Sequence, residues 1–166
     1  WINQDMVGKF EAAMQAAARA NVPASLLESK VAEGEAKRVP QERIAAAVEA
    51  RASALIRASE VMQRAEIAAQ GAAQLSVAAD ALTAGVSESA LIEVSREAAP
   101  ERRTVAVAVL ADLVRLGTTS ELALTRVSAA LTSNAALANL QAEVASQLRL
   151  GGQQSTIEAG GILRIQ

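Results

Sequence analysis

The most apolar stretch of the chain is residues 104–116, which read TVAVAVLADLVRL. It follows Pro100 and a short charged turn, it stops at Gly117, and its polar residues are Thr104, Asp112 and Arg115. A helix with so few polar positions must be covered on most sides. We therefore expect a central helix, opened at Pro100 and closed at Gly117, with the other elements packed around it.

The same stretch also has an alternative interpretation as a β-strand. Val105, Val107 and Val109 alternate with alanines, which is the period of a half-buried strand. No second segment of the chain has the pattern of a strand that could pair with it, and an unpaired buried strand leaves backbone groups unsatisfied. The helix is therefore the favoured interpretation.

Apolar residues at helical spacing predict five helices before this stretch. One face of the first carries Met6, Phe10, Met14 and Ala17, and Asn3 is its expected N-cap. The third is the longest, at roughly 40 Å by the helical rise per residue. The five helices are expected at about residues 4–20, 23–37, 40–69, 73–83 and 88–98.

Two more helices are expected after Gly117. Thr118 or Thr119 caps the first of them. Asn134 caps the second, and the glycine pair at 151–152 is expected to end it, which leaves 152–166 as a C-terminal tail. The clearest apolar stripe in the chain lies on this last helix and consists of Leu137, Leu140, Val144 and Leu148.

Three of the expected helix starts share a pattern in which one apolar residue precedes another by five positions. The spacing is that of a hydrophobic staple, and the proline or serine between them suits a first helical turn. The pattern indicates short-looped helical hairpins and a degenerate internal repeat, of which Gly117-Thr118-Thr119 is a weaker copy. The three copies are Asn21-Val22-Pro23 with Leu27, Arg38-Val39-Pro40 with Ile44, and Gly85-Val86-Ser87 with Leu91.

The composition supports an all-α fold. Roughly a quarter of the 166 residues are alanine, and Trp1 and Phe10 are the only aromatic residues. Alanine favours helices, whereas sheets favour β-branched and aromatic residues. We therefore predict a single compact domain over 1–166 with about eight helices. The length suffices to bury a core without disulfides.

The charges and the missing residue types exclude several functions. Lys and Arg number 16 against 18 Asp and Glu, with the signs interspersed, so we expect no nucleic-acid partner. The chain has no His, Cys or Tyr. This removes the usual zinc and haem ligands and the commonest general base, so we expect no metal, no cofactor and no enzymatic activity. No apolar run reaches the ~20 residues of a membrane-spanning helix.

The best candidate binding site is a polar cluster on the second helix. Lys30, Glu33 and Lys37 share one face, with Arg43 soon after in the sequence. The cluster could hold a small anion or carboxylate. The favoured interpretation is a surface ladder in which Glu33 and Lys37 form an i, i+4 pair worth ~0.3–0.5 kcal/mol. Gly34 costs a helix ~1 kcal/mol relative to alanine, so we expect it to allow close packing against another helix.

Asp112 and Arg115 are the predicted buried polar residues. Asp112 lies on a helix with almost no polar face, and a buried carboxylate needs a partner or a shifted pKa. Arg115 at i+3 is one candidate, and the other candidates are backbone N–H groups at a helix start or Arg102, Arg103 and Arg126. Structural pairing is favoured over catalysis because a lone Asp has no second catalytic group here.

Several of these segments resemble a group of bacterial proteins. The segments Val22-Pro23, Glu33–Lys37, Val39-Pro40 and Leu110–Leu113 resemble the GVP-type helix starts, EG-x-A-K segment and LADL segment of uncharacterised Ala/Leu-rich proteins that are associated with export. The resemblance covers most of residues 20–150 and implies an all-helical fold, with no established activity. The chain departs from the pattern where Asn21 and Arg38 replace glycine.

The sequence predicts a non-enzymatic helical interaction or structural module, with a protein partner or a second copy of the chain. The alternative is a carrier of a small apolar or amphipathic ligand in a cavity between helices. An enclosed apolar cavity would favour the carrier, and an exposed apolar groove would favour the partner interface. The chain begins at Trp1 rather than Met, which is compatible with an upstream signal peptide and export to the periplasm.

Overall fold

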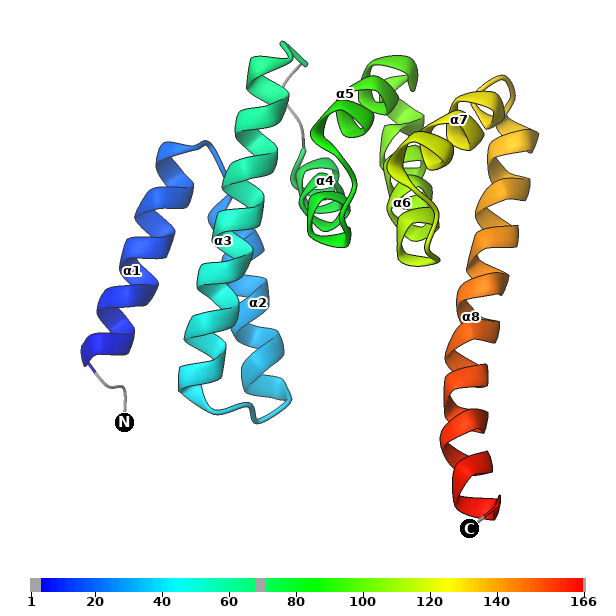
Figure 1. Ribbon diagram of the computed structural model, residues 1–166. Coiled ribbons are helices and arrows are strands. Elements are labelled where there is room, and N and C mark those ends of the chain that lie inside the picture. The colour runs from blue at the N-terminus through cyan, green and yellow to red at the C-terminus, as the bar shows by residue number, and fades with distance from the viewer. Residues whose placement is uncertain (1–3, 68–70, 166) are drawn as a thin grey trace. The chain divides into compact units, whose positions relative to one another are not determined.

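Helices separated by short turns make up the part of the chain that the computed structural model describes, residues 4–67 and 71–165, with side chains described as far as Gly151. This part contains eight helices and no strand, which confirms the all-α prediction (Figure 1). The expected cap Asn3 lies outside the described residues. The helices are α1 (Gln4–Arg19), α2 (Ala24–Ala36), α3 (Gln41–Arg64), α4 (Ala72–Ala84), α5 (Glu88–Glu97), α6 (Pro100–Arg115), α7 (Ser120–Ala130) and α8 (Asn134–Ile165).

Contacts along the chain define two compact units, Trp1–Thr83 and Ala84–Gln166. In the first unit, α3 packs against both α1 and α2, and α1 also contacts α2. Leu27 of α2 and Val48 and Leu55 of α3 are fully buried in its core. The prediction of one domain over 1–166 stays a prediction.

In the second unit, α6 packs against α5, α7 and α8. The buried side chains of α6 include Val107, Val109, Leu110 and Leu113. The apolar stretch is therefore a helix that begins at Pro100, and the strand alternative is wrong. Its central position is confirmed within this unit.

Besides α4, which is followed by Gly85 with a φ of 103°, four of the described helices end at a residue with positive φ, and three of these four residues are not glycine. The φ values are 62° at Asn21, 56° at Arg38, 58° at Glu66 and 98° at Gly117. In each case the next residue donates its N–H to a carbonyl five positions back, as Val39 does to Gly34 at 2.9 Å. This is the Schellman arrangement. Asn21 and Arg38 therefore adopt the left-handed conformation that glycine would adopt more easily.

The expected staple positions are also confirmed. Pro23, Pro40 and Ser87 are the N-cap residues of α2, α3 and α5. Each expected pair therefore occupies the N′ and N4 positions. Thr119 caps α7, and its hydroxyl accepts from Leu122 N at 3.2 Å.

Two predicted helix ends are wrong. α3 ends at Arg64 instead of near 69, because Glu66 adopts positive φ and Ile67 N bonds to Met62 O at 3.0 Å. α8 does not stop at the glycine pair and continues to Ile165, through most of the predicted tail. At the other helix ends, an apolar or β-branched residue follows the residue with positive φ. The residue that follows the glycine pair at 151–152 is Gln153, which is polar.

The predicted cap of α8 is also wrong. Asn134 is its first helical residue, and the Ser133 hydroxyl accepts from Ala136 N at 3.0 Å. The serine side chain therefore satisfies an N–H group of the first turn.

Candidate functional site

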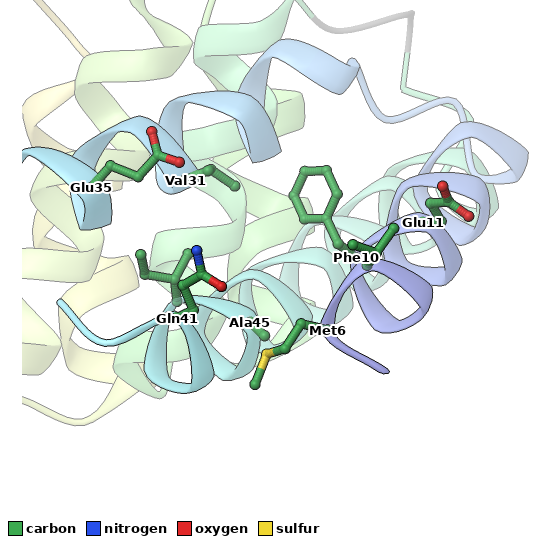
Figure 2. Close-up of a pocket in the computed structure, with 9 residues that line it drawn as sticks. Met6, Phe10, Glu11, Val31, Glu35, Gln41 and Ala45 are labelled. Carbon is green, nitrogen blue, oxygen red and sulfur yellow. The ribbon is translucent and has the colours of Figure 1, made fainter. Parts of the chain in front are cut away.

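An open apolar groove lies in the first unit between α1, α2 and α3. Its volume is about 400 Å³. Its apolar lining comes from all three helices (Figure 2): Met6, Val7, Phe10, Val31, Ile44 and Ala45. We call this feature the apolar groove.

Side-chain size along α1 explains why the groove is there. Ala13 and Ala17, toward the C-terminal end of α1, are buried, and small residues allow helices to approach closely. Met6 and Phe10, toward the N-terminal end, are only half-buried, and Val7 is 36% exposed. The predicted apolar face of α1 is therefore covered at one end and left open at the other.

Ile44 and Gly34 fix the wall of the groove between α2 and α3. A Cβ atom added at Gly34 would lie 2.7 Å from Ile44 Cγ1 and 3.1 Å from its Cδ1. These distances are shorter than ordinary van der Waals contacts. The expectation that Gly34 allows close helix packing is confirmed, and the residue it accommodates lines the groove.

The polar residues that line the apolar groove are Glu11, Glu35 and Gln41. Glu11 comes from α1 and Glu35 from α2, and Figure 2 shows the two carboxylates on either side of the Phe10 ring. Both glutamates are exposed. Among the described lining residues none is basic, so the groove carries negative charge at its edges.

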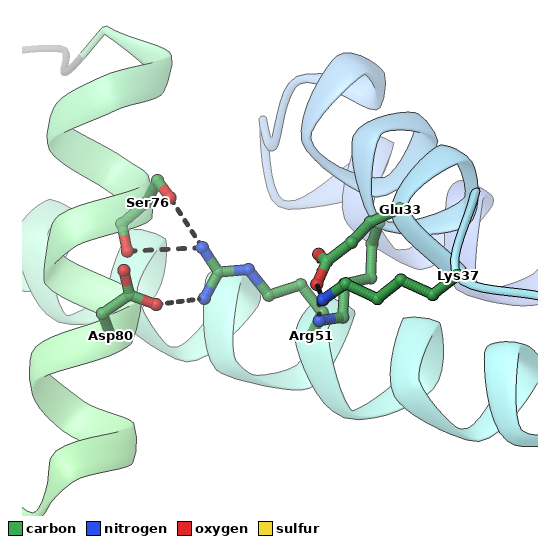
Figure 3. Close-up of polar contacts among 6 residues, drawn as sticks. Glu33, Lys37, Arg51, Ser76 and Asp80 are labelled. Atoms are coloured by element: carbon green, nitrogen blue, oxygen red, sulfur yellow. Dashed lines mark hydrogen bonds and ion pairs between the residues drawn. The ribbon is translucent and has the colours of Figure 1, made fainter. Parts of the chain in front are cut away.

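A second, polar pocket of about 310 Å³ lies against α2, α3 and α4. Arg51 of α3, with 20% of its side chain exposed, donates to Asp80 Oδ1 at 2.7 Å and to Ser76 Oγ at 2.6 Å (Figure 3). Lys30 and Glu33 line the same pocket. Since the arginine is held by two groups of α4, its contacts fasten α4 to α3.

The structure brings together three of the four predicted binding residues. Glu33 pairs with Lys37 at 2.7 Å and with Lys30 at 3.4 Å. The hydrogen bond from Lys37, then that from Lys30 and the positive charges of both, hold the pKa of Glu33 below its ordinary value. These are the contacts of a surface ladder. Arg43 is exposed and, in the part of the chain described, has no side-chain partner.

Sequence reasoning missed Arg51, Ser76 and Asp80. Arg51 and Asp80 are separated by 29 positions, so no local spacing relates them. The ladder could be predicted because all its members lie on one helix.

Of the candidate partners for Asp112, Arg115 is the one that pairs with it, and the predicted burial of the two residues is wrong. Arg115 Nη1 lies 2.7 Å from Asp112 Oδ1, but 30% of the Asp112 side chain and 45% of the Arg115 side chain are exposed. Both residues belong to a partly exposed stripe of α6 with Glu101, Val105 and Ala108. Val105 and Ala108 are apolar but lie on this outer face. The apolar pattern of the sequence therefore overestimates how much of α6 is buried.

Arg102 and Arg103 donate to carbonyl groups near the ends of neighbouring helices. Arg102 binds Leu131 O at 3.3 Å and Ser133 O at 3.0 Å, just after α7. Arg103 Nε binds Ser95 O at 2.8 Å in the last turn of α5. Helix C-termini carry partial negative charge and unpaired carbonyls, which guanidinium groups satisfy.

Other kinds of site are not indicated. The described residues contain no cluster of acidic, His or Cys side chains suited to a metal ion. Within the same residues, every helix is too short or too polar to cross a bilayer. No protein-family model, curated protein or solved structure is significantly similar to this chain. Function must therefore be inferred from the groove itself.

Proposed function

We propose that this chain is a non-enzymatic helical interaction module that binds an apolar segment of a partner polypeptide in the apolar groove. The observation that carries the proposal is the open end of α1. There Met6 and Phe10 are half-buried and Val7 is exposed. An exposed, concave apolar surface with polar edges is typical of protein interaction sites.

The shape of the groove favours a polypeptide over a small molecule. A carrier normally encloses most of the surface of its ligand. Here the lining side chains of α1 remain partly exposed. Side chains of three helices line the apolar groove, and this geometry can receive the apolar face of another helix.

The volume of the apolar groove keeps one alternative function open. About 400 Å³ lies within the range of small-molecule pockets. The second candidate function is therefore a carrier of a small apolar or amphipathic ligand held in the same groove.

Photo-crosslinking from inside the groove tests the proposal. A photoreactive phenylalanine analogue replaces Val7, and a matched variant carries it at Leu122, which is 62% exposed on α7 in the other unit. We expect one discrete polypeptide adduct from position 7, none from position 122, and loss of the adduct when Phe10→Ala is added.

Native mass spectrometry of the gently purified protein gives the opposing result. A small molecule that co-purifies with the chain and is lost in Phe10→Ala would establish the carrier in place of the interaction module. Equal adducts from positions 7 and 122 would show that the groove has no special role.

A further inference from the structure

The charges at the groove indicate the chemistry of its partner. We infer that the apolar groove takes a basic amphipathic helix, in which Lys or Arg residues flank the apolar anchors. This inference rests on the proposed function. It goes beyond it by naming the partner's secondary structure and charge.

The first observation is that both groove carboxylates are unpaired. Among the described residues, neither the Glu11 side chain nor the Glu35 side chain has a hydrogen bond or an ion pair. Glu33, two residues before Glu35 on the same helix, is held by two lysines. Glu35 therefore faces away from the ladder, and its charge remains available at the groove.

The second observation is where the two charges lie. They come from α1 and α2, on either side of the apolar ring of Phe10 (Figure 2). A ligand with one apolar anchor between two cationic groups matches this order. A ligand with acidic flanks would place like charges together, which costs affinity.

The third observation concerns secondary structure. The described chain contains no strand, so it presents no sheet edge to which an extended peptide could add. The walls are the sides of three helices. Apolar anchors at i and i+4 of a fourth helix fit such a channel.

Three peptides that share one apolar face test the charge. Each carries two leucines one helical turn apart, and the flanking positions are all Lys, all Gln or all Glu. Binding to the full chain is followed by fluorescence anisotropy of a label on the peptide. We expect the Lys peptide to bind about tenfold tighter than the Gln peptide, since each exposed ion pair contributes a factor of about two to five.

Matched variants of the chain locate the effect. The double variant Glu11→Gln, Glu35→Gln should remove the preference for the Lys peptide. Phe10→Ala should weaken the binding of all three peptides. Glu60→Gln is the control, because Glu60 is an exposed residue of α3 about 24 Å along the helix axis from Ile44. A proline placed mid-peptide should abolish binding if the partner must be helical.

The outcomes separate this inference from the proposed function. Equal binding of the Lys and Gln peptides, still lost in Phe10→Ala, would overturn the basic partner and leave the interaction module standing. Undiminished binding of the proline peptide would overturn the helical partner alone. If no peptide binds but monomeric dodecyltrimethylammonium does, the carrier replaces both. Absence of any binding overturns both.

Discussion

Replacing Gly34 with alanine tests the packing that forms the groove wall. The new Cβ would lie 2.7 Å from Ile44 Cγ1, so the isoleucine or the helix must move. Ile44 is β-branched and has few alternative rotamers in a helix, so a change of rotamer that relieves the contact costs energy. The substitution would also push Ile44 toward the groove that it lines.

Two opposing effects determine how much Gly34→Ala changes the free energy of unfolding. Alanine in a helix interior is favoured over glycine by about 1 kcal/mol. Overpacking a well-filled contact typically costs about 1–3 kcal/mol. We therefore expect Gly34→Ala to lower the free energy of unfolding by about 1 kcal/mol. Gly8→Ala is the matched control, because Gly8 lies inside α1 with no atom near its Cβ position, and it should raise stability by up to about 1 kcal/mol.

Urea unfolding followed by far-ultraviolet circular dichroism measures both variants, with amide exchange assigning the change to α1, α2 and α3. The double-mutant cycle with Ile44→Ala isolates the contact. Removing the Ile44 side chain should make Gly34→Ala stabilising. If Gly34→Ala stabilises the wild-type chain as much as Gly8→Ala does, or if the Ile44→Ala background leaves its sign unchanged, the close contact does not limit packing.

Four further predictions concern the charged residues. Arg51→Ala should lower the free energy of unfolding by about 1–2 kcal/mol, measured in urea, because two groups of α4 lose their donor. The pKa of Glu33, followed by carboxyl NMR, should lie below its ordinary value and rise in Lys37→Met. Any stabilisation from the Glu33–Lys37 pair is present at pH values above the pKa that Glu33 has in the unfolded chain. It is lost as the pH falls through the pKa that Glu33 has in the folded chain. Arg38→Gly should raise the melting temperature, because it relieves a positive φ that costs a non-glycine residue about 1 kcal/mol. A lower melting temperature would refute this. Arg102→Met should cost about 1–3 kcal/mol in thermal unfolding, whereas Arg102→Lys should cost less.

The helix stops show what local sequence can predict. Val22 and Val39 follow the left-handed residues at which α1 and α2 end, and proline comes next, so these stops could be recognised without glycine. The stop at Glu66 could not, since glutamate rarely adopts positive φ. At the glycine pair the residue type suggested a stop, but glycine permits positive φ without requiring it.

The candidate sites show the same division between local and distant information. The Lys30, Glu33 and Lys37 ladder follows from spacing on one helix. The contacts of Arg51 depend on how α4 meets α3, and no pattern in the chain encodes that. The apolar face of α1 was recognisable, but its exposure was not, because burial depends on what the other helices place against each residue.

The apolar groove follows from an uneven distribution of side-chain size. Alanines at 13 and 17 let one end of α1 pack closely. Met6 and Phe10 at the other end are too large for the same approach, and in Figure 1 that end of α1 diverges from α3. A helix built only from alanine would leave no groove, and one built only from large residues would fill it. The alanine-rich composition that favours the fold therefore also explains why the few large apolar side chains of α1 gather where a partner can reach them.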